Sequence, residues 1–442
     1  MANTVIYRNS VSSGATKITF SAWVKVSAVG GQLFSCYTSN DRRAKVYFAS
    51  NQLRIWLKDS SGNEGYVYTA RVFTDPNAFY HIVVAQDNTL STDTDRIKIY
   101  INGVRETATW SGSKPTQNST TWILGHGKVM HGTGYYNSSF ENQYFDGLMS
   151  HIHVCYGTAL APTVFGSVDS TTGEWKINTA PSFTPGTNGF TILKDGNTIT
   201  DESANSNNFS LGGGTITVTK DCPDNVFATL NPLMPLGSNI AYSNGNLTIT
   251  PGTSDYKTTA STIAVGSGKF YTEFKAVSGH NGSTDVSIGI VGADTFLAST
   301  TSKAMSAYTN AFSYGSGGLV KQYNGATIRT DATFTNGNII GIAVDMDNLK
   351  LYWSKNGTYN NSGDPTSGST GTGAIAITAG QPYYICAATI SSGGVKVFSA
   401  NFGSPPYANS SSAADGNGFG DFEYAPPSGY FSLNTKNLAE YG

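Results

Sequence analysis

The feature that most constrains the fold of this chain is a pattern of alternating apolar residues that occurs twice. The first copy alternates over residues 80–85, passes through a polar stretch, resumes over 97–101 and ends at Asn102-Gly103. The second copy runs over residues 340–353 and ends at Asn356-Gly357. A period of two buries one face of a β-strand, and Asn-Gly accepts the positive φ angles of a tight hairpin turn. Two β-hairpins so far apart in one chain predict two β-sandwich (jelly-roll-like) domains.

The composition supports an all-β fold. Among 442 residues there are 50 glycines and 25 tyrosines, whereas only 13% of the residues are charged. Such a turn-rich, aromatic and weakly charged chain is typical of short strands joined by many turns. Every apolar run with helical spacing is interrupted by Gly, Pro or Asn-Gly, so we expect only a few short helices.

Charge and hydropathy exclude several classes of function. The 27 basic and 29 acidic residues give a net charge of −2, and no basic run marks a nucleic-acid-binding surface. No apolar run approaches the roughly 20 residues that span a bilayer, and residues 1–4 lack the pattern of a secretory signal. We therefore expect a soluble chain, made in a cytoplasm and without membrane insertion. The 4 cysteines are too widely spaced for a zinc or redox pair, so free and mostly buried thiols are expected.

The pattern divides the chain into four regions. Residues 1–166 open and close with alternating strands, as expected of a sandwich that pairs its termini. Residues 167–229 form a bridging segment, where turn residues interrupt every apolar run and short strands should pack on one or both domains. Residues 230–404 form the second sandwich. Residues 405–442 predict an extended C-terminal tail with little capacity for burial, ordered by docking on a neighbour.

Strand segments in each sandwich carry a resemblance to a known family. The first region contains FSAWVK at 20–25, FYHIV at 79–83, KIYING at 98–103 and FDGLMSH at 145–151, and it resembles the laminin-G-like, concanavalin A-like lectin and glucanase sandwich. The second region contains GNIIGIAVDMD at 337–347, KLYWSKNG at 350–357 and ANFG at 400–403, and it resembles a SPRY domain, a related sandwich of interaction modules.

The joins between these regions carry a more specific resemblance. They read TALAPTVFG at 158–166, TGEWK at 172–176 and DNVFATLNPL at 224–233, with PPSGY at 426–430 and LNTKNL at 433–438 after the second sandwich. These segments are similar to those of virion appendage proteins of tailed bacteriophages, in which a laminin-G-like domain precedes a SPRY domain. The resemblance implies a structural or host-recognition role on a tail fibre, a head fibre or a capsid decoration. It also implies a virion location after synthesis in the host bacterial cytoplasm, contacts with capsid or tail proteins, and assembly as a homo-oligomer such as a trimer.

Because glycosidases share the laminin-G-like fold, the sequence has to be tested for catalytic residues. Retaining glycosidases need two carboxylates roughly 5 Å apart, which on a strand requires a Glu-x-Asp-x-Glu type of run. No such run is present, and the separation of Glu141 and Asp146 would place the two side chains on opposite faces of a strand. Neither a Gly-x-Ser-x-Gly nucleophile motif before a helix nor a phosphate-binding loop is present. We expect no enzymatic activity unless carboxylates converge from separate strands.

The strongest candidate ligand surface is a set of loops that combines aromatic rings with short polar side chains. Aromatic faces stack on sugar rings, and Asn, Ser and His side chains supply adaptable hydrogen bonds. A contact between subunits, or a loop folded on itself, is the alternative interpretation. The candidate ligand-binding residues are His126, Lys128, His131, Tyr135, Tyr136, Asn137 and Glu141.

Calcium is the one cofactor that the family resemblance suggests. Laminin-G-like domains often hold calcium near the rim of the sandwich, and Asp87, Asp93 and Asp95 lie in a loop where oxygen ligands could gather. Solvated hairpin carboxylates are the other interpretation of these residues, and no other metal or cofactor is expected.

Three tryptophans lie within alternating strands, at Trp23, Trp56 and Trp353. Large aromatic side chains in such strands predict burial in a core or between domains.

The sequence therefore predicts a non-enzymatic phage virion protein of two β-sandwich domains, oligomeric on the particle, whose outer loops recognise a host surface glycan. Two alternatives stay open. One is a capsid-decorating or cementing protein with no receptor role, and the other is an appendage enzyme that degrades surface polysaccharide.

Overall fold

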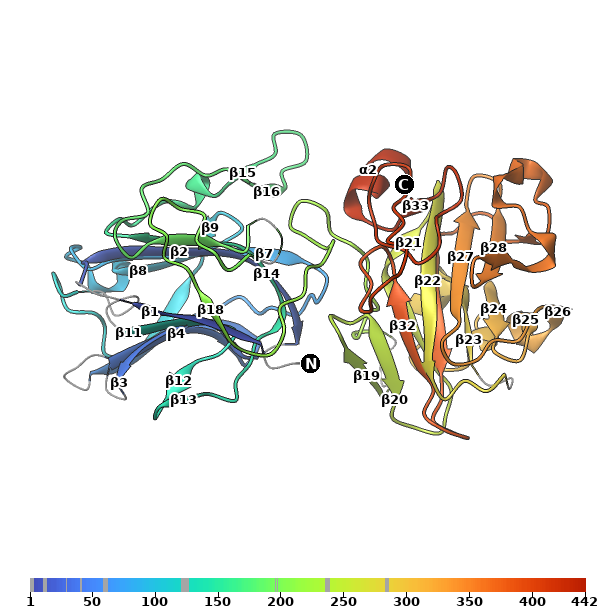
Figure 1. Ribbon diagram of the computed structural model, residues 1–442, viewed down its shortest axis with the longest axis horizontal. Coiled ribbons are helices and arrows are strands. Elements are labelled where there is room, and N and C mark those ends of the chain that lie inside the picture. Colours follow the sequence, from blue (N-terminus) through green and yellow to red (C-terminus); the bar gives the residue numbers. More distant parts are fainter. Residues whose placement is uncertain are drawn as a thin grey trace. The chain divides into compact units, whose positions relative to one another are not determined.

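The computed structural model describes residues 4–10, 14–28, 30–39, 42–58, 63–120, 127–194, 196, 198–234, 239–282 and 286–442. The chain divides into two compact units, Met1–Val218 and Thr219–Gly442. Each unit stacks two mainly antiparallel sheets face to face, so the predicted all-β fold with two sandwiches is confirmed (Figure 1). Within the described residues, no helix has the length and apolar character needed to cross a membrane.

The first unit combines an eight-stranded sheet with a six-stranded sheet. In spatial order the eight-stranded sheet contains β10 (Ala108–Gly112), β6 (Glu64–Thr69), β5 (Gln52–Lys58), β4 (Arg42–Ala49), β3 (Gln32–Ser39), β11 (Gly127–His131), β1 (Val5–Ser10) and β18 (Ser210–Gly213). The six-stranded sheet contains β17 (Phe190–Ile192), β14 (Asp146–Tyr156), β2 (Lys17–Ala28), β7 (Phe79–Asp87), β8 (Ile97–Ile101) and β9 (Val104–Arg105). Two small hairpins join β12 (Tyr135–Tyr136) to β13 (Ser139–Phe140), and β15 (Gly166–Val168) to β16 (Trp175–Ile177).

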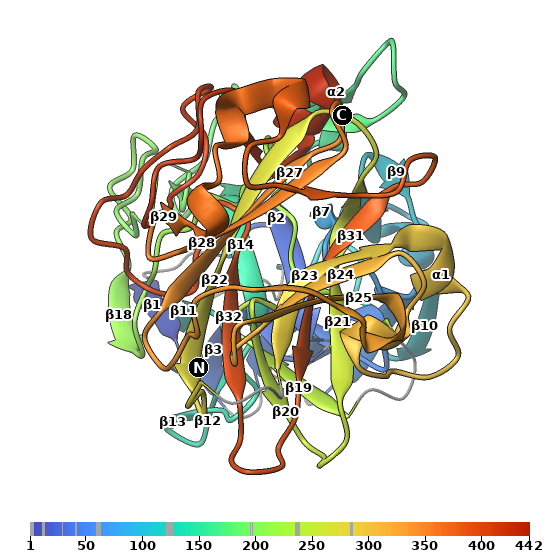
Figure 2. The same cartoon turned by 90° about the vertical axis from the view of Figure 1, so that its right-hand side faces the viewer.

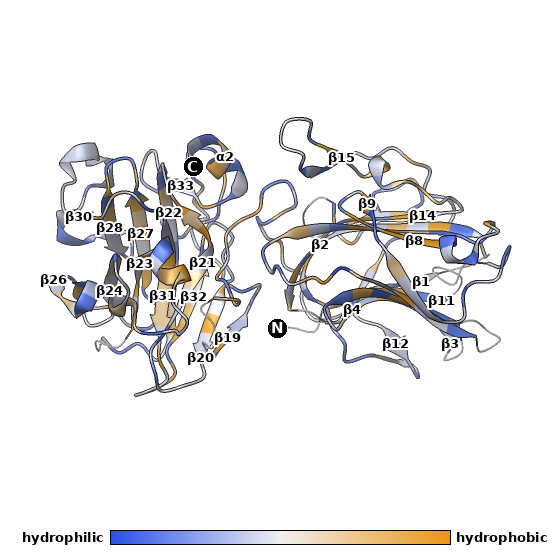
Figure 3. Cartoon of the chain, turned by 180° about the vertical axis from the view of Figure 1, so that it is seen from behind, coloured by the Kyte–Doolittle hydropathy of each residue, from blue (hydrophilic) through white to orange (hydrophobic). Residues whose placement is uncertain are grey.

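The first predicted hairpin is formed by β7 and β8. Ile82 lies opposite Ile101 and Val84 lies opposite Ile99, and all four side chains are buried between the two sheets. The turn at Asn102-Gly103, which joins β8 to β9, has positive φ at both residues, as the sequence predicts. Figure 3 shows apolar residues along strands such as β2 and β14, in keeping with a core built from the inner faces of both sheets.

The segment that follows the first sandwich covers the outer face of the six-stranded sheet. Phe165 stacks on His153 with ring centroids 5.5 Å apart. The Trp175 indole N–H donates a 3.0 Å hydrogen bond to Nδ1 of His81, and Nε2 of the same ring lies 2.9 Å from the Ser21 hydroxyl. Burial lowers the pKa of His81 to about 3, so the ring is neutral and its Nε2–H donates to Ser21. Because of this cover, β2 and β7 are buried on both faces, whereas the alternating pattern of their sequence predicts burial of one face only.

The bridging segment predicted over residues 167–229 divides between the two units after Val218. Its strand β17 pairs with β14, and its strand β18 pairs with β1. Phe190 and Phe209 from this segment enter the core of the first unit, whereas Leu230 just beyond it lies in the core of the second. Strands β17 and β18 of the bridging segment thus extend the sheets of the first sandwich, whereas β15 and β16 pair with each other.

The second unit combines a nine-stranded sheet with a six-stranded sheet. The nine-stranded sheet contains β19 (Ile240–Ser243), β20 (Thr248–Pro251), β32 (Val397–Asn401), β22 (Lys269–Ser278), β27 (Ile339–Asp345), β28 (Lys350–Lys355) and β29 (Thr358–Tyr359), with β33 (Phe431–Ser432) beside β22 and β30 (Ile375–Ala376) beside β28. The six-stranded sheet contains β21 (Lys257–Val265), β31 (Tyr383–Thr389), β23 (Ser287–Gly292), β24 (Ala311–Gly315), β25 (Leu319–Gln322) and β26 (Thr327–Thr330). Figure 2 looks at this unit, in which β32, β22 and β27 run side by side.

Within the described ranges, helices are few and short, as the composition predicts. The α-helices are α1 (Ala293–Leu297) and α2 (Thr435–Tyr441). The 3₁₀ helices are η1 (Asp93–Asp95), η2 (Pro162–Val164), η3 (Met305–Ala307), η4 (Tyr323–Gly325), η5 (Asn360–Ser362) and η6 (Pro365–Thr370).

The second predicted hairpin is formed by β27 and β28, where Ile342 lies opposite Trp353 in the core. Trp353 and Trp23 are buried, as predicted for both. The four cysteines, all of them among the described residues, form no disulfide, and Cys222 is the one that is not fully buried.

The C-terminal segment packs on the outer face of the nine-stranded sheet. Phe422 and Tyr430 are buried against Tyr271 and Tyr352, and β33 pairs in parallel with β22. The expectation of little burial over residues 405–442 is therefore wrong, because aromatic residues spaced among the Pro and Gly residues supply apolar area. The segment does take its order from docking, and the surface it docks on belongs to its own unit.

A buried carboxylate joins this segment to the sheet. Glu273 on β22 is fully buried and accepts hydrogen bonds from the backbone N–H groups of Glu423 (3.0 Å) and Tyr424 (2.8 Å). The Asn401 amide and the Tyr271 hydroxyl each donate a further 3.2 Å hydrogen bond to it. Burial raises the pKa of Glu273 to about 7, and the donors oppose this shift without cancelling it.

We predict that Trp175→Phe destabilises the first unit by about 1–3 kcal/mol, because it leaves the buried Nδ1 acceptor of His81 without a donor. Urea unfolding of the full chain, followed by circular dichroism, measures the change. The matched control is Trp56→Phe, where the lost indole N–H donates to the exposed Glu64 and a change below about 0.5 kcal/mol is expected. Equal losses in the two variants would contradict the role given to the His81 hydrogen bond.

We predict that the second unit loses stability as the pH rises from about 4.5 to about 7. The folded state retains the Glu273 proton that the unfolded chain has already released in this window, so stability is full at lower pH and falls through the raised pKa. The shift corresponds to at most about 3 kcal/mol. Urea unfolding at several pH values should show this slope for the native chain and not for Glu273→Gln. Parallel pH profiles for the two proteins would show that Glu273 does not titrate in this way.

Candidate functional site

The outer face of the eight-stranded sheet carries alternating basic and aromatic side chains. On β4, Arg43, Lys45 and Tyr47 point outward between the buried Ala44, Val46 and Phe48. Neighbouring strands continue the pattern in register, since Lys45 lies opposite Trp56 and Trp56 lies opposite Tyr66. We call this surface the outer face, and its residues are Tyr7, Tyr37, Arg43, Lys45, Tyr47, Arg54, Trp56, Tyr66, Tyr68 and Lys128.

The hairpin of β12 and β13 lies over one part of this face, above β3 and β11. Tyr135 meets Tyr37 edge to face, with ring centroids 5.0 Å apart. The Lys128 ammonium lies 4.4 Å from the ring centre of Tyr135 and 4.7 Å from that of Tyr7. A pocket of about 370 Å³ opens here, lined by Tyr7, Lys128, Tyr135, Ser138, Ser139, Phe140, Leu211 and Gly212.

On the other side of the hairpin, Arg43 is held between two aromatic rings. Its guanidinium carbon lies 4.3 Å from the ring centre of Tyr136 and 4.7 Å from that of Trp56. The Trp56 indole N–H donates a 2.7 Å hydrogen bond to Glu64, which fixes the orientation of the ring. This stack holds its three side chains in place while leaving Tyr136 43% exposed.

An ion pair ties the hairpin to the sheet. The Lys45 ammonium lies 2.5 Å from Oε2 of Glu141, and the fully buried Gln32 donates a 2.7 Å hydrogen bond to the same oxygen. Burial lowers the pKa of Lys45, and the contact with Glu141 opposes this effect. The Thr133 hydroxyl also donates to the backbone carbonyl of Glu141, at 2.5 Å. Glu141 thus anchors the loop that carries Tyr135 and Tyr136.

The structure brings together four of the predicted ligand residues, namely Lys128, Tyr135, Tyr136 and Glu141. Asn137 is exposed at the tip of the same hairpin, with a φ of 46°. His126 lies outside the described residues.

The prediction for His131 is wrong, because its side chain belongs to the core. It is 2% exposed, and its ring packs against Phe34 at 5.1 Å and Phe209 at 5.5 Å. Nδ1–H donates to the Leu33 carbonyl at 3.1 Å, and burial lowers the pKa of the ring to about 3. On β11, His131 points inward, whereas Lys128, three residues earlier, points outward.

The three aspartates considered for calcium each meet a different base. Asp87 pairs with Lys17 at 3.0 Å, Asp93 pairs with Lys114 at 3.1 Å, and Asp95 pairs with Arg105. In the part of the chain that the structure describes, no group of three or more His, Cys, Asp or Glu residues converges as a metal site would require. Calcium binding stays a prediction.

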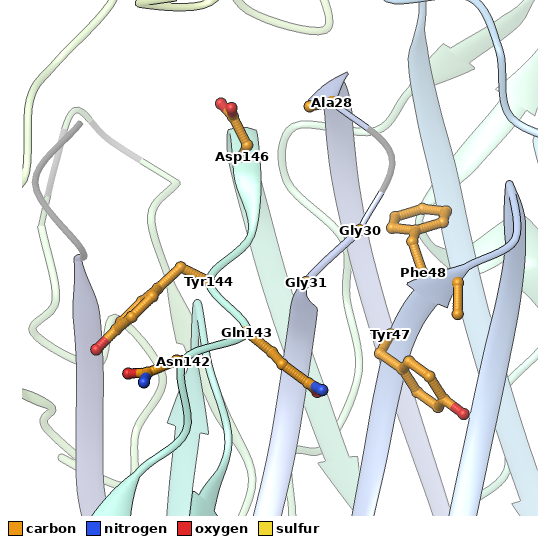
Figure 4. Close-up of a pocket in the computed structure, with 10 residues that line it drawn as sticks. Ala28, Gly30, Gly31, Tyr47, Phe48, Asn142, Gln143, Tyr144 and Asp146 are labelled. Carbon is orange, nitrogen blue, oxygen red and sulfur yellow. The ribbon is translucent and has the colours of Figure 1, made fainter.

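A second pocket, of about 380 Å³, lies at the rim of the first sandwich near the ends of β2 and β4 (Figure 4). Asn142, Gln143, Tyr144 and Asp146 line one side, and Tyr47 links the pocket to the outer face. Burial raises the pKa of Asp146. Glu141 and Asp146 therefore occupy different surroundings, because Glu141 is held by Lys45 and Gln32 whereas Asp146 lines the rim.

Sequence reasoning missed several residues of the outer face. It predicts burial for Trp56, which instead points outward beside Arg43 and Lys45. The signal that could have revealed these residues is the choice of residue types at the outward-facing positions of β4 and β5. A solvent-facing strand usually places small or charged residues there, whereas here bases alternate with large aromatic rings.

Residues 2–164 match the model of the concanavalin A-like lectin/glucanases superfamily, which confirms the predicted resemblance of the first region. No curated protein sequence matches the chain. Among solved structures, the SPRY domain of human HERC1 is 18% identical, with a TM-score of 0.29, and the match covers 36% of this chain and 91% of that one. The mouse laminin alpha1 domains LG4-5 are 10% identical, with a TM-score of 0.28, and the match covers 86% of this chain and 78% of that one. The CBM40 domain of Ruminococcus gnavus IT-sialidase, bound to alpha2,3 sialyllactose, is 15% identical, with a TM-score of 0.26, and the match covers 34% of this chain and 80% of that one. Likenesses this low support no functional inference.

We predict that Glu141→Gln lowers the stability of the first unit by about 1.5–3 kcal/mol, since it leaves the half-buried Lys45 ammonium without its carboxylate. Thermal unfolding of the full chain measures the loss. The matched control is Asp93→Asn, which breaks the more exposed pair with Lys114 and should cost less than about 1 kcal/mol. A loss for Glu141→Gln no larger than the control would refute the anchoring role.

Proposed function

We propose that this chain is a structural virion protein of a tailed bacteriophage, a fibre or appendage component that recognises a host surface glycan through its first unit. One observation supports glycan recognition above the others. The outer face presents aromatic rings, cations and hydroxyl groups together on a rigid sheet, within a region that matches the lectin model. The place on a virion follows from the sequence resemblance of the joins, which implies capsid or tail proteins as partners and a homo-oligomeric assembly such as a trimer.

The arrangement of the outer face favours binding to sugars. Aromatic rings bury the apolar face of a sugar ring at low conformational cost, because two torsion angles fix each ring. Here Trp56 and Tyr136 are already ordered by the guanidinium between them, and Tyr135 is ordered by Tyr37 and Lys128. Side chains that are ordered before the ligand arrives lose little entropy on binding.

A binding role suits these residues better than a catalytic one. Glu141, the acid nearest the exposed rings in sequence, is paired with Lys45 and bonded to Gln32. A glycosidase acid needs a raised pKa and a second carboxylate facing the same bond. The proposal therefore assigns Glu141 to holding the hairpin.

We predict that Tyr136→Ala weakens glycan binding at least about tenfold, because it removes an exposed ring and frees Arg43. The measurement is titration of the full chain against those oligosaccharides that it binds on an array of bacterial lipopolysaccharide and capsular glycans. Tyr323→Ala is the matched control, since Tyr323 lies in the second unit and is 44% exposed. Failure of the native chain to bind any glycan, together with stoichiometric co-sedimentation with purified capsids, would favour a decorating protein instead.

A further inference from the structure

We infer that the glycan recognised by the outer face is acidic, with separate anionic groups held by Arg43 and by Lys128 while its sugar rings stack on Tyr135 and Tyr136. This inference rests on the proposed function and names the chemical class of its ligand.

The charges of the outer face do not balance among the described residues. Lys45 pairs with Glu141, and Lys58 lies opposite Glu64 in the sheet register. Arg43, Arg54 and Lys128 have no carboxylate at ion-pair distance within the described part of the chain, and rings take that place. The chain as a whole has a net charge of −2, so this positive surface is a local feature and not a consequence of a basic composition.

The two principal cations flank one aromatic residue. Lys128 and Arg43 lie on either side of Tyr37 in register, on strands β11 and β4. Adjacent strands are about 4.8 Å apart, so the two backbone positions are separated by about 10 Å across the sheet. Tyr135 packs edge to face on Tyr37, and the Lys128 ammonium lies 4.4 Å from its ring centre. An extended glycan lying across the strands can therefore meet a cation, a ring and a second cation in turn.

The environment of Arg43 suits an anion better than a neutral hydroxyl group. Its guanidinium carbon lies close to the rings of Tyr136 and Trp56, and its N–H donors form a planar fork. A planar fork of donors matches the two oxygens of a carboxylate or phosphate, and such bidentate bonds are stronger than neutral ones. The hydroxyl-bearing Ser138 and Ser139 line the pocket around Lys128 and complete a set of donors for an acidic sugar.

A matched pair of polysaccharides tests this inference on the full chain. One member is a capsular polysaccharide that contains uronic acid, and the other is the same polymer after chemical reduction of its carboxyl groups. A phosphate-bearing teichoic acid serves as a second anionic probe. We expect the native chain to bind at least one of the two anionic polymers, to bind the reduced polymer at least about tenfold more weakly than its parent, and to lose affinity between 50 and 500 mM salt, the two ionic strengths chosen for the assay.

Substitutions localise the effect. Arg43→Gln should weaken binding of the acidic polymer about ten- to hundredfold, and Arg43→Lys should restore part of it, because the charge returns without the fork. Lys355→Gln, which removes one positive charge from the second unit, should leave binding unchanged. Thermal unfolding confirms that each variant is folded.

Three results would overturn the inference. Equal binding of parent and reduced polymers would show that the anionic group does not contribute to binding, while the proposed glycan recognition would stand. Loss of binding in a metal chelator would show that a cation other than Arg43 and Lys128 holds the anion. Binding to acidic proteins and to no glycan would overturn both this inference and the proposed function.

Discussion

The burial of one outer sheet face by the chain that follows it is the constraint on which the rest of each unit depends. In the first unit Trp175 donates to His81, and Phe165 covers His153, so the six-stranded sheet is closed on both sides. In the second unit Phe422 and Tyr430 close the nine-stranded sheet in the same way, with Glu273 accepting from the backbone of the covering segment. A polar group under such a cover must find its partner within the protein, which explains the histidine and carboxylate networks found there. Among the described residues, the outer face of the eight-stranded sheet is covered only in part, by the hairpin that carries Tyr136 and Glu141.

Much of this architecture could be predicted from the sequence because it rests on local rules. The two hairpins follow from a period of two, and the registers of Ile82 with Ile101 and Ile342 with Trp353 bear this out. The Asn-Gly turns at 102–103 and 356–357 then lead into β9 and β29. The covering segments could not be predicted in the same way. Their aromatic residues are single and separated by Gly, Pro and Ser, so no periodic signal exists, and only the tertiary partner decides that Tyr430 is buried or that Trp175 packs against His81.

The sequence allows the region of the candidate site to be predicted, but not which side chains form it. The ring-rich hairpin at 135–141 is visible in the sequence, whereas the sheet beneath it is not. His131 and Lys128 lie in one strand, three residues apart, and therefore face opposite sides of the sheet. Which of the two faces the core depends on the register with β3, and that register depends on contacts distant in sequence. Trp56 illustrates the converse case, because a residue type usually buried is here held at the surface by Arg43 and Glu64.

The same physics explains why the outer face can remain both exposed and ordered. A sheet face that exposes large rings would promote aggregation if the rings were mobile and no charged side chains lay among them. Interleaving Arg43, Arg54 and Lys128 among them keeps the surface charged and fixes the rings through cation–π contacts. Within the part of the chain that the structure describes, these three cations have no carboxylate at ion-pair distance, whereas Lys45 pairs with Glu141, which holds the hairpin. A surface whose cations contact aromatic rings and not carboxylates remains charged and still attracts an external anion. Recognition of an acidic glycan would depend on this property.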